Sequence, residues 1–474
     1  MGVLQLWLSV FTPFIFVSLV CSEANTDEVT SLPGISPKLI TFKQYSGYLN
    51  ATGTRRFHYW FVESESNPAK DPVVFWMNGG PGCSSLIGFF SENGPFLPSN
   101  DGKTLALNPY RWNKIANMVF LESPAGVGFS YSASSVPNTS DEEVAQDNYL
   151  AVQNFFVKYP NLKANPFYLT GESYCGIYTP TLAVKILEGN ATINMQGFMI
   201  GNPLVNYSLN TNSLMYYAFW HGVISAKMWE EMLQYCCNDG DDCTFYQSTN
   251  ENCKVRVDQA NSLVYKQGLN PYALYQDCYK GIPPHLHQYI TNMNGIYPEY
   301  KSKWKQIREE IRKQPKVSPA PRLGGQKVGS LDCVNSTAMT AYLNTATVQK
   351  AIHVTATTNW ATCSDAVSDN YVRNYKDMTP QFQKLLRSYR SLIYHGDTDM
   401  ECNFLGGEWF VENLGQPVKV AYRDWTYNNQ VAGFVKEFEN ITYMTVKASG
   451  HMVPQYKPAQ AYQMFSNFLL NKPQ

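Results

Sequence analysis

A glycine-flanked serine near the middle of the chain lies between an apolar, strand-like segment and a helical one. Residues 167–170 read Phe-Tyr-Leu-Thr, residues 171–176 read Gly-Glu-Ser-Tyr-Cys-Gly, and a helical pattern follows from about 177 to 187. A strand, a tight turn and a helix in this order expose the hydroxyl of Ser173 at the end of a strand. Cys175 stands where such turns usually carry glycine, and its side chain is small enough for helix and strand to approach closely.

The partners that a nucleophilic serine needs follow later in the chain. Asp399 comes after a predicted strand at 391–395, and His451 comes after a predicted strand at 441–446. An imidazole activates the serine by removing its proton, and a carboxylate orients the imidazole. The order Ser, Asp, His is that of α/β-hydrolases. We therefore predict an α/β-hydrolase fold with a mixed, mostly parallel central sheet and an inserted, mostly helical cap domain.

Two neighbouring residues compete for the same roles on pattern alone. His395 is the alternative to His451, and Asp397 is the alternative to Asp399. For Ser173 the alternative is a tight turn without catalytic function, since Gly-x-Ser also occurs at 82–84.

A second glycine-rich loop follows a buried strand predicted at 72–78. Residues 76–85 read Trp-Met-Asn-Gly-Gly-Pro-Gly-Cys-Ser-Ser. Such a turn exposes backbone N–H groups, which suits an oxyanion hole. A phosphate-binding loop is excluded, because no Gly-Lys-Ser/Thr is present.

Composition narrows the choice of partners. The formal net charge is −1 over 474 residues, which gives no electrostatic reason to expect nucleic acid or an anionic membrane surface. The cysteines at 236, 237, 243 and 253 lack a paired Cys-x-x-Cys spacing, which favours disulfides over a metal site. We expect no metal and no cofactor.

The N-terminus and the glycosylation sequons indicate the secretory pathway. Residues 3–20 are apolar and uncharged, so we interpret 1–24 as a signal peptide, with an uncleaved anchor helix as the alternative. No later segment is apolar for long enough to span a bilayer. The six sequons begin at Asn50, Asn138, Asn190, Asn206, Asn335 and Asn440. A lysosomal or extracellular location is expected.

The chain divides into a core and an insertion. We predict the first part of the core at 25–205, a cap domain at 206–331 and the second part of the core at 332–474. The segment 301–329 is basic and rich in Pro and Gly, which is typical of a site of proteolytic processing. An ordinary surface loop is the alternative.

Five separate motifs together resemble the signatures of the serine carboxypeptidase family. The resemblance runs from about residue 35 to the C-terminus, and within the family it is closest to animal lysosomal members. The motifs lie at 76–85, 122–131, 171–176, 396–403 and 450–454.

The resemblance implies roles for particular residues. The family's catalytic residues match Ser173, Asp399 and His451, and its oxyanion hole matches the backbone N–H groups of Gly80 and Tyr174. The positions that bind the terminal carboxylate of a peptide match Trp76, Asn78, Gly79, Glu92 and Glu172.

The resemblance also implies a disulfide pattern. The pairs are Cys83–Cys363, Cys236–Cys253, Cys237–Cys243 and Cys278–Cys333. Cys175 and Cys402 are left over. The family motif has alanine at the position of Cys175, so the state of that thiol stays open.

The paired glutamates carry a chemical consequence. Two carboxyls that lie close together repel when both are ionised, so one of Glu92 and Glu172 should have a raised pKa. Protonated carboxyls donate hydrogen bonds to a peptide's terminal carboxylate, whereas ionised ones repel it. We therefore expect a serine-type carboxypeptidase that cleaves the C-terminal peptide bond through an acyl-enzyme and is favoured at acidic pH.

Two alternatives stay open at this point. The same residues can serve a carboxypeptidase-like acyltransferase, and the chain can act as a protective binding partner of other lysosomal hydrolases. The expected partners are peptides or proteins with a free C-terminal carboxylate. A homodimer stays open, and the side-chain preference is not predicted.

Overall fold

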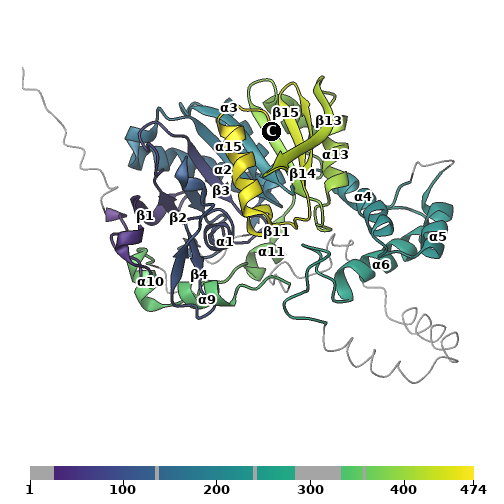
Figure 1. The fold of residues 1–474 in the computed structure, drawn as a ribbon, viewed down its shortest axis with the longest axis horizontal. Coiled ribbons are helices and arrows are strands. Elements are labelled where there is room, and N and C mark those ends of the chain that lie inside the picture. Colours follow the sequence, from purple (N-terminus) through teal and green to yellow (C-terminus); the bar gives the residue numbers. More distant parts are fainter. Residues whose placement is uncertain (1–25, 134–137, 239–242, 283–332, 356–358) are drawn as a thin grey trace, which may run out of the picture.

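The structure is a computed structural model that describes residues 26–133, 138–238, 243–282, 333–355 and 359–474 (Figure 1). The predicted signal peptide and the proposed processing segment at 301–329 lie outside the described residues. Among the described helices, none combines the length and the apolar character needed to cross a membrane.

One large sheet organises the molecule. Its order is β1-β2-β6-β3-β9-β10-β12-β15-β14-β13, and the short β7 pairs with β2. The strands from β6 to β15 in this order run parallel, and antiparallel strands complete both edges. The bounds are β1 Gln44–Asn50, β2 Arg55–Val62, β3 Val73–Met77, β6 Asn117–Leu121, β7 Tyr131–Ser132, β9 Phe167–Glu172, β10 Met195–Gly201, β12 Arg390–Gly396, β13 Val418–Tyr427, β14 Gln430–Phe438 and β15 Ile441–Val446.

The central strand β3 shows why the sheet is covered on both faces. All five of its residues are buried and apolar, as expected of a parallel strand between two layers. Successive side chains point to opposite faces, so Phe75 packs in one hydrophobic cluster and Trp76 in the other.

Helices on each face complete these clusters. The cluster of Phe75 takes side chains from α2 (Asp141–Lys158), α3 (Cys175–Glu188), α12 (Thr379–Leu385) and α13 (Phe404–Asn413). The cluster of Trp76 takes them from α1 (Leu86–Ser91), α9 (Thr337–Leu343), α10 (Ala346–Ala351) and α15 (Pro458–Leu469). Ser140 caps α2 by accepting the N–H of Glu143.

Smaller elements fill the remaining loops. They are β4 Phe96–Pro98 paired with β5 Leu105–Leu107, β8 Thr139–Ser140 paired with β11 Tyr371–Val372, the helices α11 Asp365–Asp369 and α14 Val453–Tyr456, and the 3₁₀ turns Pro37–Leu39, Trp112–Lys114 and Pro160–Leu162.

Three helices between β10 and β12 form a separate cluster at one end of the molecule (Figure 1). They are α4 (Tyr207–Trp220), α5 (Ala226–Cys236) and α6 (Glu251–Lys266). Met400 and Leu405, from the loop after β12 and from α13, are buried in the same cluster. These helices therefore pack directly on the loop that carries Asp399.

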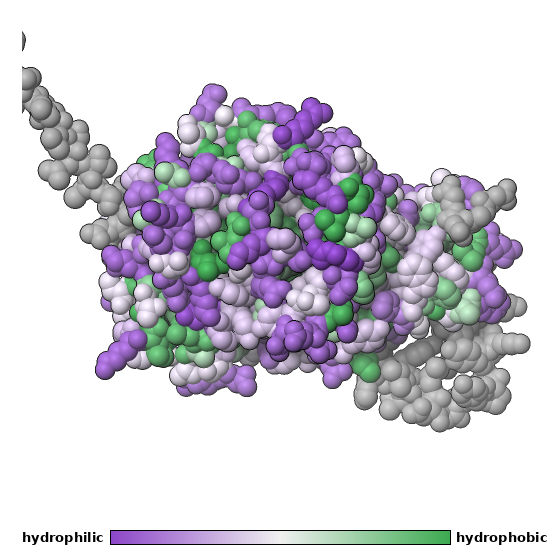
Figure 2. Space-filling view, turned by 45° about the horizontal axis from the view of Figure 1, so that its top comes forward, coloured by the Kyte–Doolittle hydropathy of each residue, from purple (hydrophilic) through white to green (hydrophobic). Residues whose placement is uncertain are grey.

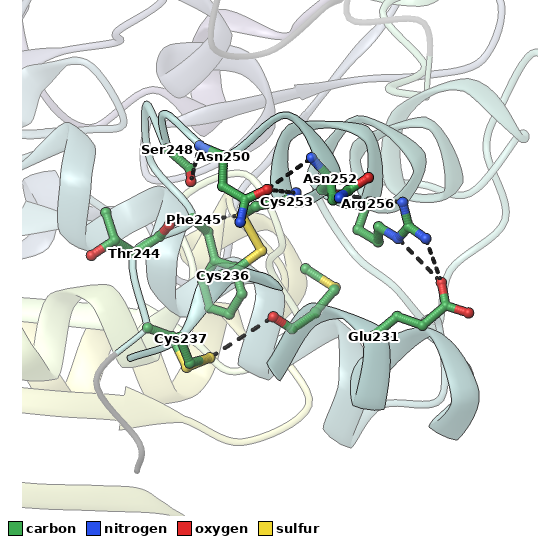
Figure 3. Close-up of a disulfide and its surroundings, with 12 residues drawn as sticks. Glu231, Cys236, Cys237, Thr244, Phe245, Ser248, Asn250, Asn252, Cys253 and Arg256 are labelled. Carbon is green, nitrogen blue, oxygen red and sulfur yellow. Dashed lines mark hydrogen bonds and ion pairs between the residues drawn. A yellow bond between two sulfur atoms is a disulfide. The ribbon is translucent and has the colours of Figure 1, made fainter. Parts of the chain in front are cut away.

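A disulfide and an ion pair join two of these helices (Figure 3). Cys236 of α5 is bonded to Cys253 of α6, and Arg256 of α6 lies 3.1 Å from the carboxylate of Glu231 of α5. Asn250 caps α6 by accepting the N–H groups of Asn252 and Cys253. The face of the molecule drawn in Figure 2 is mostly hydrophilic, with apolar residues in small, separate patches.

Candidate active site

The turn between β9 and α3 holds Ser173 in a rare backbone conformation. Ser173 has φ +65°, in the left-handed region that side chains other than glycine seldom adopt. The neighbouring glycines allow the close packing that enforces it. A Cβ on Gly171 would lie 2.3 Å from the carbonyl oxygen of Met77, and one on Gly176 would lie 2.4 Å from that of Leu204. Ser173 itself stays partly exposed.

The Cys175 side chain fits this tight turn. It is fully buried, is not part of a disulfide, and its Sγ donates to the Met77 carbonyl oxygen at 2.9 Å. Burial raises the pKa of the thiol well above its ordinary value. The thiol is therefore a packing group beneath the turn, where it is neutral and shielded.

His451 and Asp399 meet at the carboxyl ends of β15 and β12. Nδ1 of His451 lies 2.7 Å from Oδ2 of Asp399, and both side chains are buried. Burial alone lowers the pKa of His451, but the adjacent Asp399 carboxylate outweighs it, so that the net shift is upward. Among the described residues, the His451 ring forms a hydrogen bond with Asp399 and none with the Ser173 hydroxyl. The distance between a catalytic histidine and serine is often long until substrate binds.

Three further hydrogen bonds hold the Asp399 carboxylate in place. Asn202 Nδ2 donates to Oδ2 at 2.8 Å, the Cys402 amide donates to Oδ2 at 3.1 Å, and the Glu401 amide donates to Oδ1 at 3.0 Å. Asn202 also accepts the N–H of Gly396 at 3.0 Å. A carboxylate with this many donors is oriented rigidly toward the imidazole.

Sequence reasoning did not identify Asn202 as part of this site. The signal that marks it is its position, because it is a polar residue directly after the apolar strand β10, at the sheet edge where ligand sites form.

His395 and Asp397, the alternatives to His451 and Asp399, form different hydrogen bonds. His395 is fully buried and its Nδ1 bonds to the Cys402 carbonyl oxygen at 3.0 Å. Burial lowers its pKa to about 4. The Asp397 carboxylate accepts the Ala448 amide at 2.7 Å. Both residues thus fix the loops on which Asp399 and His451 stand.

The glycine-rich loop after β3 lies against the Ser173 turn. A Cβ on Gly79 would lie 2.3 Å from the Tyr174 nitrogen and 2.9 Å from the Ser173 Cβ. Gly80 has φ +115°, a conformation that favours glycine. The backbone N–H groups expected to form the oxyanion hole are therefore on adjacent segments.

Asn78 forms hydrogen bonds with three of the residues expected to bind a terminal carboxylate. Trp76 Nε1 donates to Asn78 Oδ1 at 2.8 Å, so the amide nitrogen of Asn78 faces away from Trp76. Asn78 Nδ2 then donates to Glu92 Oε1 at 3.1 Å and to Glu172 Oε1 at 2.8 Å. The two glutamates come from the end of α1 and the end of β9, and both are buried.

Apart from the other carboxyl of the pair, one oxygen of each glutamate has no hydrogen-bond partner among the described residues. These atoms are Glu92 Oε2 and Glu172 Oε2. Burial raises the pKa of Glu92 to about 7. Burial, together with the adjacent Glu92 carboxyl, raises the pKa of Glu172 well above its ordinary value. At acidic pH the pair is protonated and can donate hydrogen bonds to an anion.

The disulfides in the structure tie the site to its surroundings. Cys83–Cys363 joins the glycine-rich loop to the segment before α11, and Cys278–Cys333 joins the segment after α6 to the one before α9. Cys236–Cys253 and Cys237–Cys243 lie among the cap helices. Cys175 and Cys402 are buried free thiols. Within the described ranges, no group of three His, Cys, Asp or Glu side chains is placed to hold a metal ion.

Comparison with known proteins identifies the family. The family model for serine carboxypeptidases matches residues 33–471. The chain is 44% identical to the lysosomal protective protein of Mus musculus, covering 95% of this chain and 94% of that protein. It is 35% identical to serine carboxypeptidase 1 of Hordeum vulgare, covering 93% and 92%.

A solved structure shows the same fold. The carboxypeptidase KEX1(delta)p of Saccharomyces cerevisiae superposes with a TM-score of 0.71 at 20% identity, covering 94% of this chain and 96% of the other. The predicted α/β-hydrolase architecture is thereby confirmed. The chain belongs to the serine carboxypeptidase family.

Proposed function

We propose that Ser173, His451 and Asp399 make this protein a carboxypeptidase that releases the C-terminal residue of peptides and proteins, most efficiently at acidic pH. The observation that carries the proposal is the buried pair Glu92 and Glu172, held by a single asparagine amide. Glu172 directly precedes Ser173 in the chain, which supports a role for the pair beside the triad.

The proposed reaction begins with attack on the last peptide bond. Ser173 Oγ bonds to the carbonyl carbon while His451 takes the hydroxyl proton, and Asp399 stabilises the imidazolium. The N–H groups of Gly80 and Tyr174 bind the oxyanion. His451 then protonates the leaving amine, the C–N bond breaks, and an acyl-enzyme remains. Water deprotonated by His451 releases the shortened peptide and restores Ser173.

The carboxyl pair selects substrates with a free C-terminus. Below about pH 7 the Glu92 carboxyl is protonated, and it can donate a hydrogen bond to the substrate carboxylate. Above that pH an ionised Glu92 repels the substrate, so KM rises. His451 acts in the opposite sense, because it becomes a better base as pH rises. Trp76 and Gly79 support the site by orienting Asn78 and by admitting the close approach of the backbone.

Matched substrates test this proposal. A blocked apolar dipeptide and the same dipeptide with a C-terminal amide differ only in the terminal charge. We expect the free acid to be hydrolysed faster at about pH 5 than at about pH 7.5, and the amide to lack this acid preference. Equal pH profiles for the two substrates would refute the role of the carboxyl pair.

The comparisons do not favour an acyltransferase. Adding excess acceptor alcohol and measuring the ester formed against the acid released tests that alternative directly. A protective binding role has one supporting observation, the name of the mouse relative. Partner hydrolases that co-purify equally with wild type and with Ser173→Ala would support a binding role beside catalysis.

We also propose that the protein enters the secretory pathway and is located in the lysosome or outside the cell. Four sequon asparagines are exposed, Asn50, Asn138, Asn190 and Asn335, and two are partly buried, Asn206 and Asn440. Glycosidase treatment followed by intact-mass measurement tests their occupancy. We treat 206–331 as the cap domain, because α4, α5 and α6 form their own hydrophobic cluster.

A homodimer is the assembly that we propose to test by light scattering. It is supported by exposed large apolar side chains on the edge hairpin of the sheet, namely Val418, Val420, Tyr422, Val431 and Phe434. A monomeric mass at micromolar concentration would contradict it.

A further inference from the structure

The motif at 122–131 has no part in the reaction above, although it begins with a fully buried glutamate, Glu122. Glu122 directly follows β6, which runs parallel to β3 and pairs with it. The segments after two neighbouring parallel strands leave the sheet at the same edge. Glu122 therefore lies at the edge from which the glycine-rich loop after β3 begins.

Three donors converge on the Glu122 carboxyl, and a histidine ring faces it. Oε1 accepts the hydroxyl of Ser84, from the glycine-rich loop. It also accepts Trp360 Nε1 at 3.0 Å. Oε2 accepts the backbone N–H of Phe129 at 3.0 Å and lies 2.9 Å from His58 Nδ1 of β2. One carboxyl thus joins four separate segments of the chain.

The contacts of His58 define its protonation state. The Ser46 hydroxyl has one proton, which it donates to the carbonyl oxygen of Ile352 at 2.9 Å. Ser46 Oγ therefore accepts from His58 Nε2, which lies 2.9 Å away. Nδ1, on the other side of the ring, faces the Glu122 carboxylate, which can only accept. With a proton on both ring nitrogens, His58 is an imidazolium and forms a fully buried ion pair with Glu122.

Two adjacent serines attach the glycine-rich loop to the end of β6. The hydroxyl of Ser84 donates to Glu122, and the hydroxyl of Ser85 donates to the carbonyl oxygen of Leu121 at 2.5 Å. Gly80, whose N–H is proposed for the oxyanion hole, lies four residues before Ser84 in the same loop. The position of that N–H therefore depends on how firmly the two serines are held.

We propose that the ion pair of His58 and Glu122 positions the oxyanion hole by holding the glycine-rich loop through the hydroxyl of Ser84. This inference rests on the proposed carboxypeptidase function. An ionised carboxylate accepts a shorter and stronger hydrogen bond than a neutral oxygen does, so it restricts Ser84 more tightly. His58 supplies the positive charge that compensates a buried carboxylate at this place. All three are positioning residues, because they act through the backbone of the loop.

The variant Ser84→Ala tests the link with the least disturbance. It removes one hydroxyl, while the Glu122 carboxyl keeps Trp360, Phe129 and His58 as partners. We expect kcat to fall at least about tenfold on a free-acid dipeptide and on its amide, with KM for the amide within about twofold of wild type. Circular dichroism and thermal unfolding check that the variant is folded.

A peptide aldehyde supplies a readout that a merely structural role would not change. The aldehyde carbon forms a hemiacetal with Ser173 Oγ, and the hemiacetal oxygen occupies the proposed oxyanion hole. In Ser84→Ala the inhibition constant of an N-blocked aldehyde should rise by the same factor by which kcat/KM falls.

A double-mutant cycle tests whether Glu122 acts through Ser84. Glu122→Gln removes the negative charge, and we expect kcat to fall at least about tenfold. In Ser84→Ala/Glu122→Gln the loss should be close to that of the more impaired single variant. The matched control is Asp147→Asn, because Asp147 is a buried carboxylate of α2 that pairs with Arg55 at 2.6 Å. It should lower the melting temperature and retain kcat.

Four results would overturn the proposal. The first is an unchanged kcat in Ser84→Ala, and the second is a reduced kcat with an unchanged inhibition constant for the aldehyde. The third is a double variant in which the two losses add, which would mean that Glu122 acts by another route. The fourth is an equal loss of kcat in Asp147→Asn. A wild-type protein that releases no C-terminal residue from the free acid would instead refute the proposed function.

Discussion

The central residues of the proposed function are two carboxyls whose pKa values are raised by burial. Glu92 and Glu172 are buried and share the Asn78 side-chain amide, and apart from each other each keeps one oxygen without a partner among the described residues. Their environment is costly for two negative charges and favourable for one anion from a substrate. The acid preference is therefore a property of the substrate site, separate from the triad.

Replacing both carboxyls tests this reasoning. In the double variant Glu92→Gln/Glu172→Gln, KM for a blocked dipeptide should no longer rise between about pH 5 and about pH 7.5, because neither amide ionises. The rate at pH 5 should fall several-fold, since an amide donates more weakly than a carboxylic acid. Steady-state kinetics at both pH values measure KM and kcat. The control is Glu408→Gln, which replaces a carboxyl of α13. A variant that keeps the wild-type pH profile would contradict the account.

Asn202 offers a second test on the residue scale. Asn202→Ala removes the 2.8 Å hydrogen bond to Asp399 and leaves a buried carboxylate oxygen with one donor fewer. We expect kcat to fall at least tenfold for acid and amide substrates alike, because the orientation of His451 serves both. A change in KM for the free acid alone would show that Asn202 acts on substrate binding instead.

At the scale of residues, part of the active site could be predicted from the sequence and part could not. The triad, the glycine loop and Glu172 were expected because each lies in a recognisable motif, whereas Glu92 was expected only from the family resemblance. Asn202 was not expected, because no local pattern shows that the residue after β10 reaches Asp399. Its contact comes from the pairing of β10 with β12, which depends on the whole sheet.

On the scale of elements, the loop after β3 is fixed from several sides. The backbone N–H of Asn78 donates to Ser85 Oγ at 3.1 Å, Cys83 is bonded to Cys363, and a Cβ on Gly79 would lie 2.3 Å from the Tyr174 nitrogen. The loop and the Ser173 turn therefore form one rigid unit whose N–H groups are set before substrate arrives.

A methyl group should disrupt this unit. In Gly79→Ala the new Cβ would lie 2.3 Å from the Tyr174 nitrogen, so the loop must move away from the turn. We expect kcat on acid and amide substrates to fall at least a hundredfold, since both reactions need the oxyanion hole. Circular dichroism checks the fold. Loss of activity on the free acid alone would contradict an oxyanion-hole role for this loop.

Some elements were predicted from sequence and others were not. Strand β3 and helix α3 have clear patterns, and their bounds were expected within one or two residues. Helix α4 was not expected, because it is enclosed between α13 and α6 and its apolar residues do not form one stripe. The hairpin β13–β14 was missed because its exposed face mixes apolar and charged side chains.

On the scale of the whole molecule, the active site makes stability depend on pH. Glu92 and Glu401 each have a folded-state pKa of about 7, above the value of about 4.3 in an unfolded chain. Their contribution to stability is complete below the unfolded pKa and is lost as pH rises through the folded pKa. His395 acts in the opposite sense, since its lowered pKa makes stability fall as pH drops from about 6.5.

The melting temperature should therefore decrease as pH rises from about 5 to about 8. In Glu92→Gln/Glu172→Gln this decrease should be smaller, because two of the titrating groups are gone. Thermal unfolding monitored by fluorescence at several pH values measures the difference between the two proteins. Parallel curves for wild type and variant would contradict the raised pKa values.

The most direct test of the central claim is the pH dependence of C-terminal release, measured on a free-acid dipeptide and on its amide. Ser173→Ala, which should lose at least about a thousandfold in kcat, fixes the background. We predict that release from the free acid is faster at about pH 5 than at about pH 7.5, and that the amide shows no such preference. An acid preference shared by both substrates would contradict the role of Glu92 and Glu172 as the site that binds the terminal carboxylate.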